Sequence, residues 1–263
     1  MPRFSANLGH LFPEYPLIER IGAAAQAGFK AIELQLPYQL APSAVKVEID
    51  RHALTMLNIN SPQSAGGEPG LAAVAGRERE FDALFAKALD YVVAIGGRQI
   101  HVMAGCVPPE QRPAAETTLV RNLVAAADAA AQKNITLLIE PINPRDRPDY
   151  FLTRTEHAAA IIAKVERPNL RIQFDFYHAQ IVGGDLIHRF EKHFPLVGHV
   201  QVAAAPSRHE PDEGEVNYPA IFAMLDSLGY QGWVGAEYRP RGRTEDGLGW
   251  ARAHGVIARE GRL

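Results

Sequence analysis

Short apolar runs rich in β-branched residues recur along the chain and alternate with segments of helical periodicity. The eight runs cover residues 4–8, 31–36, 58–60, 99–103, 135–140, 170–175, 198–202 and 233–238. Several of them are apolar at nearly every position, which is typical of parallel strands that are covered on both faces. Strands that alternate with helices form βαβ units, and eight such units predict a closed (β/α)₈ TIM barrel of the α/β class.

Helix signals fill the intervals between these runs. The predicted helices cover residues 17–28, 78–95, 119–132 and 218–228, and a further helix begins at Thr155. Gly28 and Gly229 stand at the ends of two of these segments, as helix-terminating glycines commonly do. Either Thr153 or Thr155 is expected to cap the helix that begins near residue 155.

The length of the chain fits one such barrel. Its 263 residues are close to the roughly 250 that are typical of the fold, and no shift in composition marks a boundary. We therefore expect a single domain over residues 1–263. Three long loops, at residues 61–76, 141–152 and 203–217, follow the third, fifth and seventh strands. In a barrel these loops lie at the C-terminal face, where active sites are assembled.

Charge and composition exclude several classes of protein. The net charge of -3 offers no basic excess to neutralise phosphates, so neither nucleic acid nor a membrane surface is an expected partner. No stretch approaches the ~20 apolar residues that span a bilayer, and the N-terminus lacks the apolar segment of a signal peptide. The single cysteine, Cys106, permits no intrachain disulfide. We expect a cytoplasmic protein, and a homo-oligomer remains open.

Common catalytic motifs are missing from the sequence. It has no glycine-rich dinucleotide or P-loop pattern, no His-Glu-x-x-His and no Gly-x-Ser-x-Gly. Dinucleotide chemistry, P-loop phosphoryl transfer, zinc-protease chemistry and the usual serine hydrolysis are therefore disfavoured. Metal-assisted proton transfer remains.

Four oxygen-bearing side chains stand at the ends of the last four predicted strands. They are Glu140, Asp175, Gln201 and Glu237. A barrel brings these positions into one ring, and an oxygen-only set of this kind suits Mg²⁺ or Mn²⁺ better than zinc. A single acid at a strand end could equally cap the next helix or pair with an arginine. Four in successive units favour a site, because a buried carboxylate must be paired or bound to a metal.

Three further residues are candidates for contact with a substrate. His178 follows Asp175 by three positions and can face the same pocket. Arg208 is on the loop after the seventh strand, where its guanidinium could bind a substrate carboxylate in a fork, although a loop arginine is often only a surface residue. His101, on the fourth strand, is either a core histidine or a pocket residue. Six other histidines are interpreted as surface or structural, namely His10, His52, His157, His188, His193 and His254.

Distinctive motifs are spread over nearly the whole chain. They are RFSANL at 3–8, GRE at 76–78, EPIN at 140–143, DFYHAQ at 175–180, HEPDEGEVNY at 209–218 and GWVGAEY at 232–238. With them the chain resembles the hydroxypyruvate isomerase family, within the xylose-isomerase-like TIM barrels. The EPIN segment looks like the hydroxypyruvate isomerase branch. The segments at 101–105, 178–180, 239–242 and 247–250 look closer to the 2-oxo-tetronate isomerase branch.

The resemblance implies roles for the candidate residues. Glu140 and Glu237 match the proposed acid–base pair of the family. The wider family of barrels implies that Glu140, Asp175, Gln201 and Glu237 hold the metal, while His178 and Arg208 face the substrate. Many of those relatives have histidine at the position of Gln201, so the resemblance implies weaker metal affinity here.

The expected function is therefore an isomerase that shifts the carbonyl of a short hydroxy-oxo acid by one carbon. One glutamate removes a proton, a divalent ion stabilises the enediolate, and the other glutamate returns the proton. The substrate is hydroxypyruvate, which gives tartronate semialdehyde, or 2-oxo-tetronate, which gives 3-oxo-tetronate. Two alternatives are a ketose 3-epimerase acting on a neutral sugar and a metal-dependent apurinic endonuclease. The latter predicts a basic surface and a cluster of metal-binding histidines.

Overall fold

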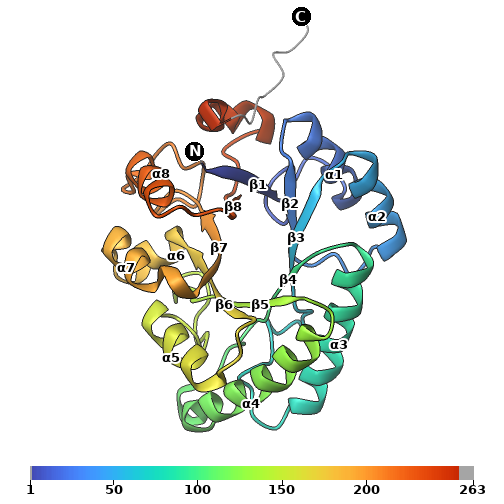
Figure 1. Cartoon of the computed structure of the whole chain (residues 1–263), viewed down its shortest axis with the longest axis vertical. Helices are drawn as coiled ribbons and strands as arrows, with labels where there is room; N and C mark the ends of the chain where they lie inside the picture. The colour runs from blue at the N-terminus through green and yellow to red at the C-terminus, as the bar shows by residue number, and fades with distance from the viewer. Residues whose placement is uncertain (1, 255–263) are drawn as a thin grey trace, which may run out of the picture.

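Eight parallel strands close into a barrel in chain order, with β8 paired to β1 (Figure 1). In this computed structural model, which describes residues 2–254, the predicted (β/α)₈ barrel is confirmed. The strands are β1 (Arg3–Asn7), β2 (Ala31–Leu34), β3 (Thr55–Asn60), β4 (Gln99–His101), β5 (Thr136–Ile139), β6 (Leu170–Asp175), β7 (Val197–Val202) and β8 (Trp233–Ala236). Each predicted run overlaps one of them.

Helices form a ring around the barrel (Figure 1). The α-helices are α1 (Leu17–Gln26), α2 (Pro42–Arg51), α3 (Glu78–Ala94), α4 (Arg112–Ala131), α5 (Thr155–Val165), α6 (Phe176–Val182), α7 (Leu186–His193) and α8 (Tyr218–Ser227). Three 3₁₀ segments complete the set, namely η1 (Pro109–Gln111), η2 (Phe194–Leu196) and η3 (Thr244–His254). No helix within residues 2–254 is long and apolar enough to cross a membrane.

Two details of the predicted helices were wrong. Helix α4 begins at Arg112, seven residues before the predicted start, because Pro113 fits the first turn of a helix rather than ending one. Helix α5 has Arg154 at its N-cap and no side-chain cap, so neither Thr153 nor Thr155 caps it. Thr155 is instead the first helical residue, and it is buried.

The long loops are tied to one another across the C-terminal face. Gly70, in the loop after β3, pairs with Ala104 beyond β4 in an antiparallel bridge. Its φ of +91° is a conformation that favours glycine, and a Cβ there would overlap the carbonyl of Met103. The Tyr150 hydroxyl, from the loop after β5, accepts a hydrogen bond from the backbone N–H of Ala104 at 2.9 Å. These contacts hold the loops after β3, β4 and β5 in place at the mouth of the barrel.

Polar side chains occupy part of the barrel interior, where aliphatic residues are more usual. Glu33 on β2 contacts Gln201 and His199 on β7, two strands that are not neighbours in the sheet. These side chains therefore cross the interior of the barrel. The buried polar residues on the strands include Ser5, Asn7, Glu33, Asn58, His101, Gln173, Asp175, His199 and Gln201. They form a polar floor directly beneath the C-terminal face.

Candidate active site in the barrel mouth

A cavity of about 440 Å³ opens at the C-terminal ends of the strands. All eight strands or the turns that follow them contribute to its wall. Among the predicted site residues, the wall includes His101, Glu140, His178, Arg208 and Glu237. Asp175 and Gln201 are also buried, but they are not among the residues that line this cavity. Of the four strand-end residues predicted from the sequence, Glu140 and Glu237 thus face this cavity.

Three buried ligand atoms gather on the β5–β6 side of this cavity. Glu140, Asp175 and His178 each offer one atom, and these atoms lie within 4.8 Å of one another. No other group of three or more His, Cys, Asp or Glu side chains in residues 2–254 is placed in this way. The predicted ligand Glu237 is not part of this group, whereas His178 is.

Three oxygen atoms of this site have no hydrogen-bond partner in the described part of the chain. Glu140 Oε1, Asp175 Oδ2 and Gln201 Oε1 are buried, and none has a hydrogen-bond partner among the described residues. Burial, together with the negative charges of Glu237 and Asp175, raises the pKa of Glu140 well above its ordinary value. Burial and the charge of Glu237 likewise raise the pKa of Asp175 to about 7. A site with unpaired buried oxygens and too little positive charge fits a hard divalent cation.

His178 is oriented by Asn143. The Asn143 backbone N–H donates to His178 Nδ1 at 3.4 Å, and the side-chain amide nitrogen of Asn143 lies 2.7 Å from the same atom. Burial lowers the pKa of His178 well below its ordinary value, so the ring is neutral. A backbone N–H can only donate, so Nδ1 carries the lone pair and the hydrogen lies on Nε2. Nε2 faces Glu140 and Asp175, which suits a hydrogen-bond donor better than a metal ligand.

Glu237 has partners that Glu140 lacks. Its Oε1 accepts a hydrogen bond from Arg208 at 2.8 Å, and its Oε2 accepts one from the Asn7 amide at 2.9 Å. Burial alone would raise its pKa. The contact with His10 and the charge of Arg208 outweigh burial and hold the pKa of Glu237 below the ordinary value. The surroundings of these two glutamates thus favour the protonated form of Glu140 and the ionised form of Glu237. An acid–base pair requires such a difference.

Arg208 spans two carboxylates of the protein itself. Its Nη2 donates to Glu237 and its Nη1 donates to Asp146 Oδ2 at 2.9 Å, while the guanidinium lies over the ring of Tyr177 at 5.1 Å. The Nε is buried and has no partner among the described residues. Both terminal nitrogens of the fork that we expected to bind a substrate are therefore already hydrogen-bonded.

Other arginines line the same cavity without such partners. The side chains of Arg145, Arg147 and Arg239 reach its wall from the loops after β5 and β8. Within residues 2–254, none of these side chains makes a hydrogen bond or an ion pair with a side chain or backbone atom. They supply positive charge that the protein does not neutralise locally. These arginines reach the cavity because of the course of the loops after β5 and β8. That course cannot be predicted from the spacing of residues in the sequence.

His101 lines the cavity, which decides between the two interpretations of it. Both ring nitrogens are buried without hydrogen bonds, and burial lowers its pKa to about 4. Its Nδ1 lies 3.4 Å from Glu140 Oε2. The interpretation of His10 as surface or structural was wrong, because its Nε2 lies 3.6 Å from Glu237 Oε1 on the cavity wall. His10 lies in the turn after β1, at the same face of the barrel as the C-terminal ends of the other strands. This position in the sequence could have identified it as a site residue.

Glu33 was not predicted as a site residue. Its side chain is fully buried on β2. Burial would raise its pKa, but the charge of His199 and the hydrogen bonds from His199, Ser5 and Gln201 lower it overall. The signal was available, because a glutamate inside the apolar run Ala31–Leu34 needs a partner just as Glu140 does.

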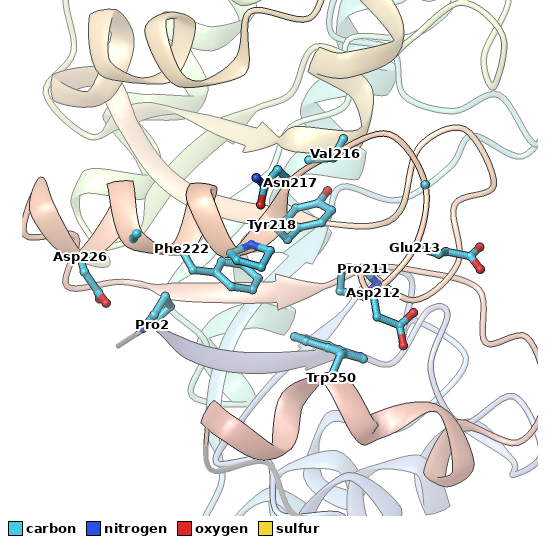
Figure 2. A pocket seen from close by; sticks show the side chains of 13 residues that line it. Pro2, Pro211, Asp212, Glu213, Val216, Asn217, Tyr218, Phe222, Asp226 and Trp250 are labelled. Carbon is cyan, nitrogen blue, oxygen red and sulfur yellow. The ribbon is translucent and has the colours of Figure 1, made fainter.

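A larger hollow lies outside the barrel. It has a volume of about 660 Å³ and lies between α8, the loop after β7 and η3 (Figure 2). Tyr218, Phe222 and Trp250 give it an apolar wall, and Asp212 and Glu213 lie at its rim. The Tyr218 hydroxyl is hydrogen-bonded to the backbone of Ala203. No buried acid or histidine lines this hollow, whereas His101, Glu140, His178 and Glu237 line the cavity in the barrel mouth, which is therefore the candidate active site.

Comparisons with known proteins agree with this fold. The family described as xylose isomerase-like TIM barrel matches residues 21–254. The 2-oxo-tetronate isomerase of Cupriavidus necator is 46% identical over 97% of this chain and 99% of the relative. The hydroxypyruvate isomerase of Escherichia coli K12 is 40% identical over 95% of this chain and 98% of the relative. A crystal structure described as an AP endonuclease, family 2, from Brucella melitensis has a TM-score of 0.94 at 45% identity, over 97% of this chain and 99% of that one. The chain therefore belongs to the hydroxypyruvate and 2-oxo-tetronate isomerase family of xylose isomerase-like TIM barrels.

Proposed function

We propose that this member of an isomerase family moves the carbonyl of a short hydroxy-oxo acid by one carbon. The substrates we propose are hydroxypyruvate and 2-oxo-tetronate, after the names of the relatives. The observation that carries the proposal is the pair Glu140 and Glu237. Both line one cavity, from different strands, and their surroundings push their pKa values in opposite directions.

The reaction needs one carboxylate that accepts a proton and one group that returns it. Glu237 is the carboxylate that its surroundings keep ionised, so we assign to it the removal of the proton from the carbinol carbon. Glu140 returns a proton to the neighbouring carbon, and the hydroxyl proton passes to the former carbonyl oxygen. To the Nε2–H of His178, which lines the same cavity, we assign a hydrogen bond to an oxygen of the enediolate. In the reverse direction the two glutamates exchange roles.

A divalent cation, Mg²⁺ or Mn²⁺, fits the unpaired oxygens of the site. We propose Glu140, Asp175, Gln201 and Glu237 as the residues that would hold it. When bound, it would supply positive charge that stabilises the negative charge developing on the substrate oxygens. It would also lower the raised pKa of Asp175, because positive charge favours the ionised form.

The substrate carboxylate needs a positively charged partner. Arg208 offers its buried Nε–H, since Asp146 and Glu237 already accept from its terminal nitrogens. Arg145, Arg147 and Arg239 offer guanidinium groups without partners on the wall of the same cavity. We propose that these three arginines favour an acid over a neutral sugar of the same size.

A substrate panel in deuterated water tests the proposal. The panel contains hydroxypyruvate, 2-oxo-tetronate, a neutral triose, a neutral tetrose and D-fructose, and NMR follows both turnover and deuterium uptake. We expect turnover of an acid, with deuterium entering at the carbon that gains the proton. If D-fructose is inverted at C3 faster than either acid is turned over, the result would instead support the 3-epimerase alternative.

An abasic-site DNA duplex belongs in the same panel, because one similar structure is described as an AP endonuclease. The net charge is -3, and the group of possible ligands contains a single histidine, so we expect no cleavage. Strand cleavage at the abasic site that is lost on Glu140→Gln substitution would overturn the isomerase proposal.

A further inference from the structure

We propose that Glu33 is a positioning residue that orients the side-chain amide of Gln201, leaving its oxygen as the atom free to bind the cation. This inference rests on the proposed function, because it assigns a use to the unpaired oxygen of Gln201. Glu33 is buried, and the proposed reaction does not use it. Its place on β2 also separates it from the strands β5 to β8 that supply the proposed ligands.

The contacts of Glu33 converge from two strands, β1 and β7. Ser5 Oγ donates to Oε1 at 2.6 Å, and His199 Nε2 lies 3.0 Å from the same oxygen. Gln201 Nε2 donates to Oε2 at 2.7 Å, and Asn7 Nδ2 donates to it at 3.3 Å. With polar hydrogens directed at both oxygens, the carboxylate acts here as an acceptor only.

This acceptor decides which way the Gln201 amide points. If the amide were reversed, its oxygen would lie 2.7 Å from a carboxylate oxygen, and the two acceptors would repel each other. The nitrogen must therefore face Glu33. The oxygen is then the free atom, and it is buried without a partner in the described part of the chain. A cation can bind an amide oxygen but not an amide NH₂, so the orientation determines whether Gln201 is a ligand at all.

A glycine on β8 leaves room for the Glu33 side chain to extend across the barrel interior. Gly235 on β8 is paired with Ser5 on one side and Gln201 on the other. A Cβ at this position would overlap Oε1 of Glu33, so glycine leaves the space that the carboxylate occupies. The same network extends to the proposed base, because Asn7 donates to Glu33 and to Glu237 with one amide nitrogen.

Binding of Mn²⁺ to the purified protein tests the role of Glu33. Free Mn²⁺ is measured by electron paramagnetic resonance for the wild type, Glu33→Gln and Ser5→Ala, and thermal unfolding checks each fold. Partners of this kind typically contribute 10–100-fold to metal affinity, so we expect Glu33→Gln to weaken binding by about that factor. Ser5→Ala is the matched control. It removes a donor to the same carboxylate but leaves the Gln201 contact, so we expect its affinity to stay within about 2-fold.

An exchange variant separates orientation from folding. Glu33→Gln combined with Gln201→Glu keeps the net charge and the paired side chains, and it presents a carboxylate oxygen at position 201 whichever way the side chain turns. We expect it to bind Mn²⁺ at least as tightly as the wild type. Wild-type affinity in Glu33→Gln, or no recovery in the exchange variant, would overturn the role of Glu33 alone. A wild-type protein that binds no Mn²⁺ would overturn the proposed cation site as well.

Discussion

Arg208 offers the sharpest test of how the site keeps Glu237, the proposed base, ionised. Its side chain is 12% exposed, and its guanidinium joins Glu237 to Asp146 through bonds of 2.8 and 2.9 Å. Replacing it with methionine removes the charge and both bonds while keeping an unbranched side chain. Lysine keeps the charge but lacks the planar fork that reaches two carboxylates at once.

The size of the effect follows from the lost bond. A hydrogen bond to a charged group contributes about 1.5–3 kcal/mol. At 1.36 kcal/mol per pKa unit, its loss should raise the pKa of Glu237 by roughly 1–2 units in Arg208→Met. A base works in its ionised form, so activity falls as the pH drops through its pKa. The acidic limb of the profile should therefore move to higher pH. Arg208→Lys should lower kcat/KM by a similar free energy with a smaller displacement of the limb.

The measurement is kcat/KM from pH 4 to 8 at saturating Mn²⁺. Asp146→Asn is the control, because it removes the other partner of Arg208 and leaves the bond to Glu237 in place. An acidic limb that stays in its wild-type position in a well-folded Arg208→Met protein would refute the argument. Some group other than Arg208 would then hold Glu237 ionised.

Three further predictions follow from the site. Glu140→Gln and Glu237→Gln should each lower kcat by ~10²–10⁴-fold at an unchanged melting temperature, and near-normal turnover in either variant would exclude the two-glutamate exchange. A chelator should lower activity, and Mg²⁺ or Mn²⁺ should restore it better than Zn²⁺; full activity in metal-free enzyme would contradict the cation site. Without a cation, the raised pKa of Asp175, about 7, stabilises the fold at low pH, and this stability should be lost as the pH rises from about 4 to 7. Melting temperatures across that range should fall in chelator and change less in Mn²⁺, and identical curves would argue against binding at Asp175.

The fold could be predicted because its signals are local. A buried parallel strand is an apolar run, and each run lies beside its own helix in the sequence. Strand ends were therefore placed to within a few residues. Glu140 lies one residue beyond the end of β5, and Asp175 is the last residue of β6. For the same reason, the acids at the ends of β5, β6 and β8 could be predicted to lie in one ring.

The rest of the site depends on contacts between distant segments. The predicted use of Arg208 considered only the chemistry of its side chain. Its actual partners, Glu237 and Asp146, come from two other loops. Its φ of +59° also directs the loop in a way that residue spacing does not reveal. Glu33 was not predicted because the predicted ligands all stand at strand ends, whereas the Glu33 side chain makes its contacts inside the barrel.

These distant contacts also change how Gln201 should be interpreted. The resemblance implies weaker metal affinity, because Gln201 stands where many relatives have histidine. That comparison treats the side chain as isolated. In the barrel, the amide NH₂ donates to the Glu33 carboxylate at 2.7 Å, and a charge-assisted bond of this kind shifts electron density toward the amide oxygen. It also fixes the orientation of the oxygen before a cation arrives, so less conformational freedom is lost on binding. The Glu33–Gln201 pair, rather than Gln201 alone, is therefore the unit to compare with histidine in those relatives.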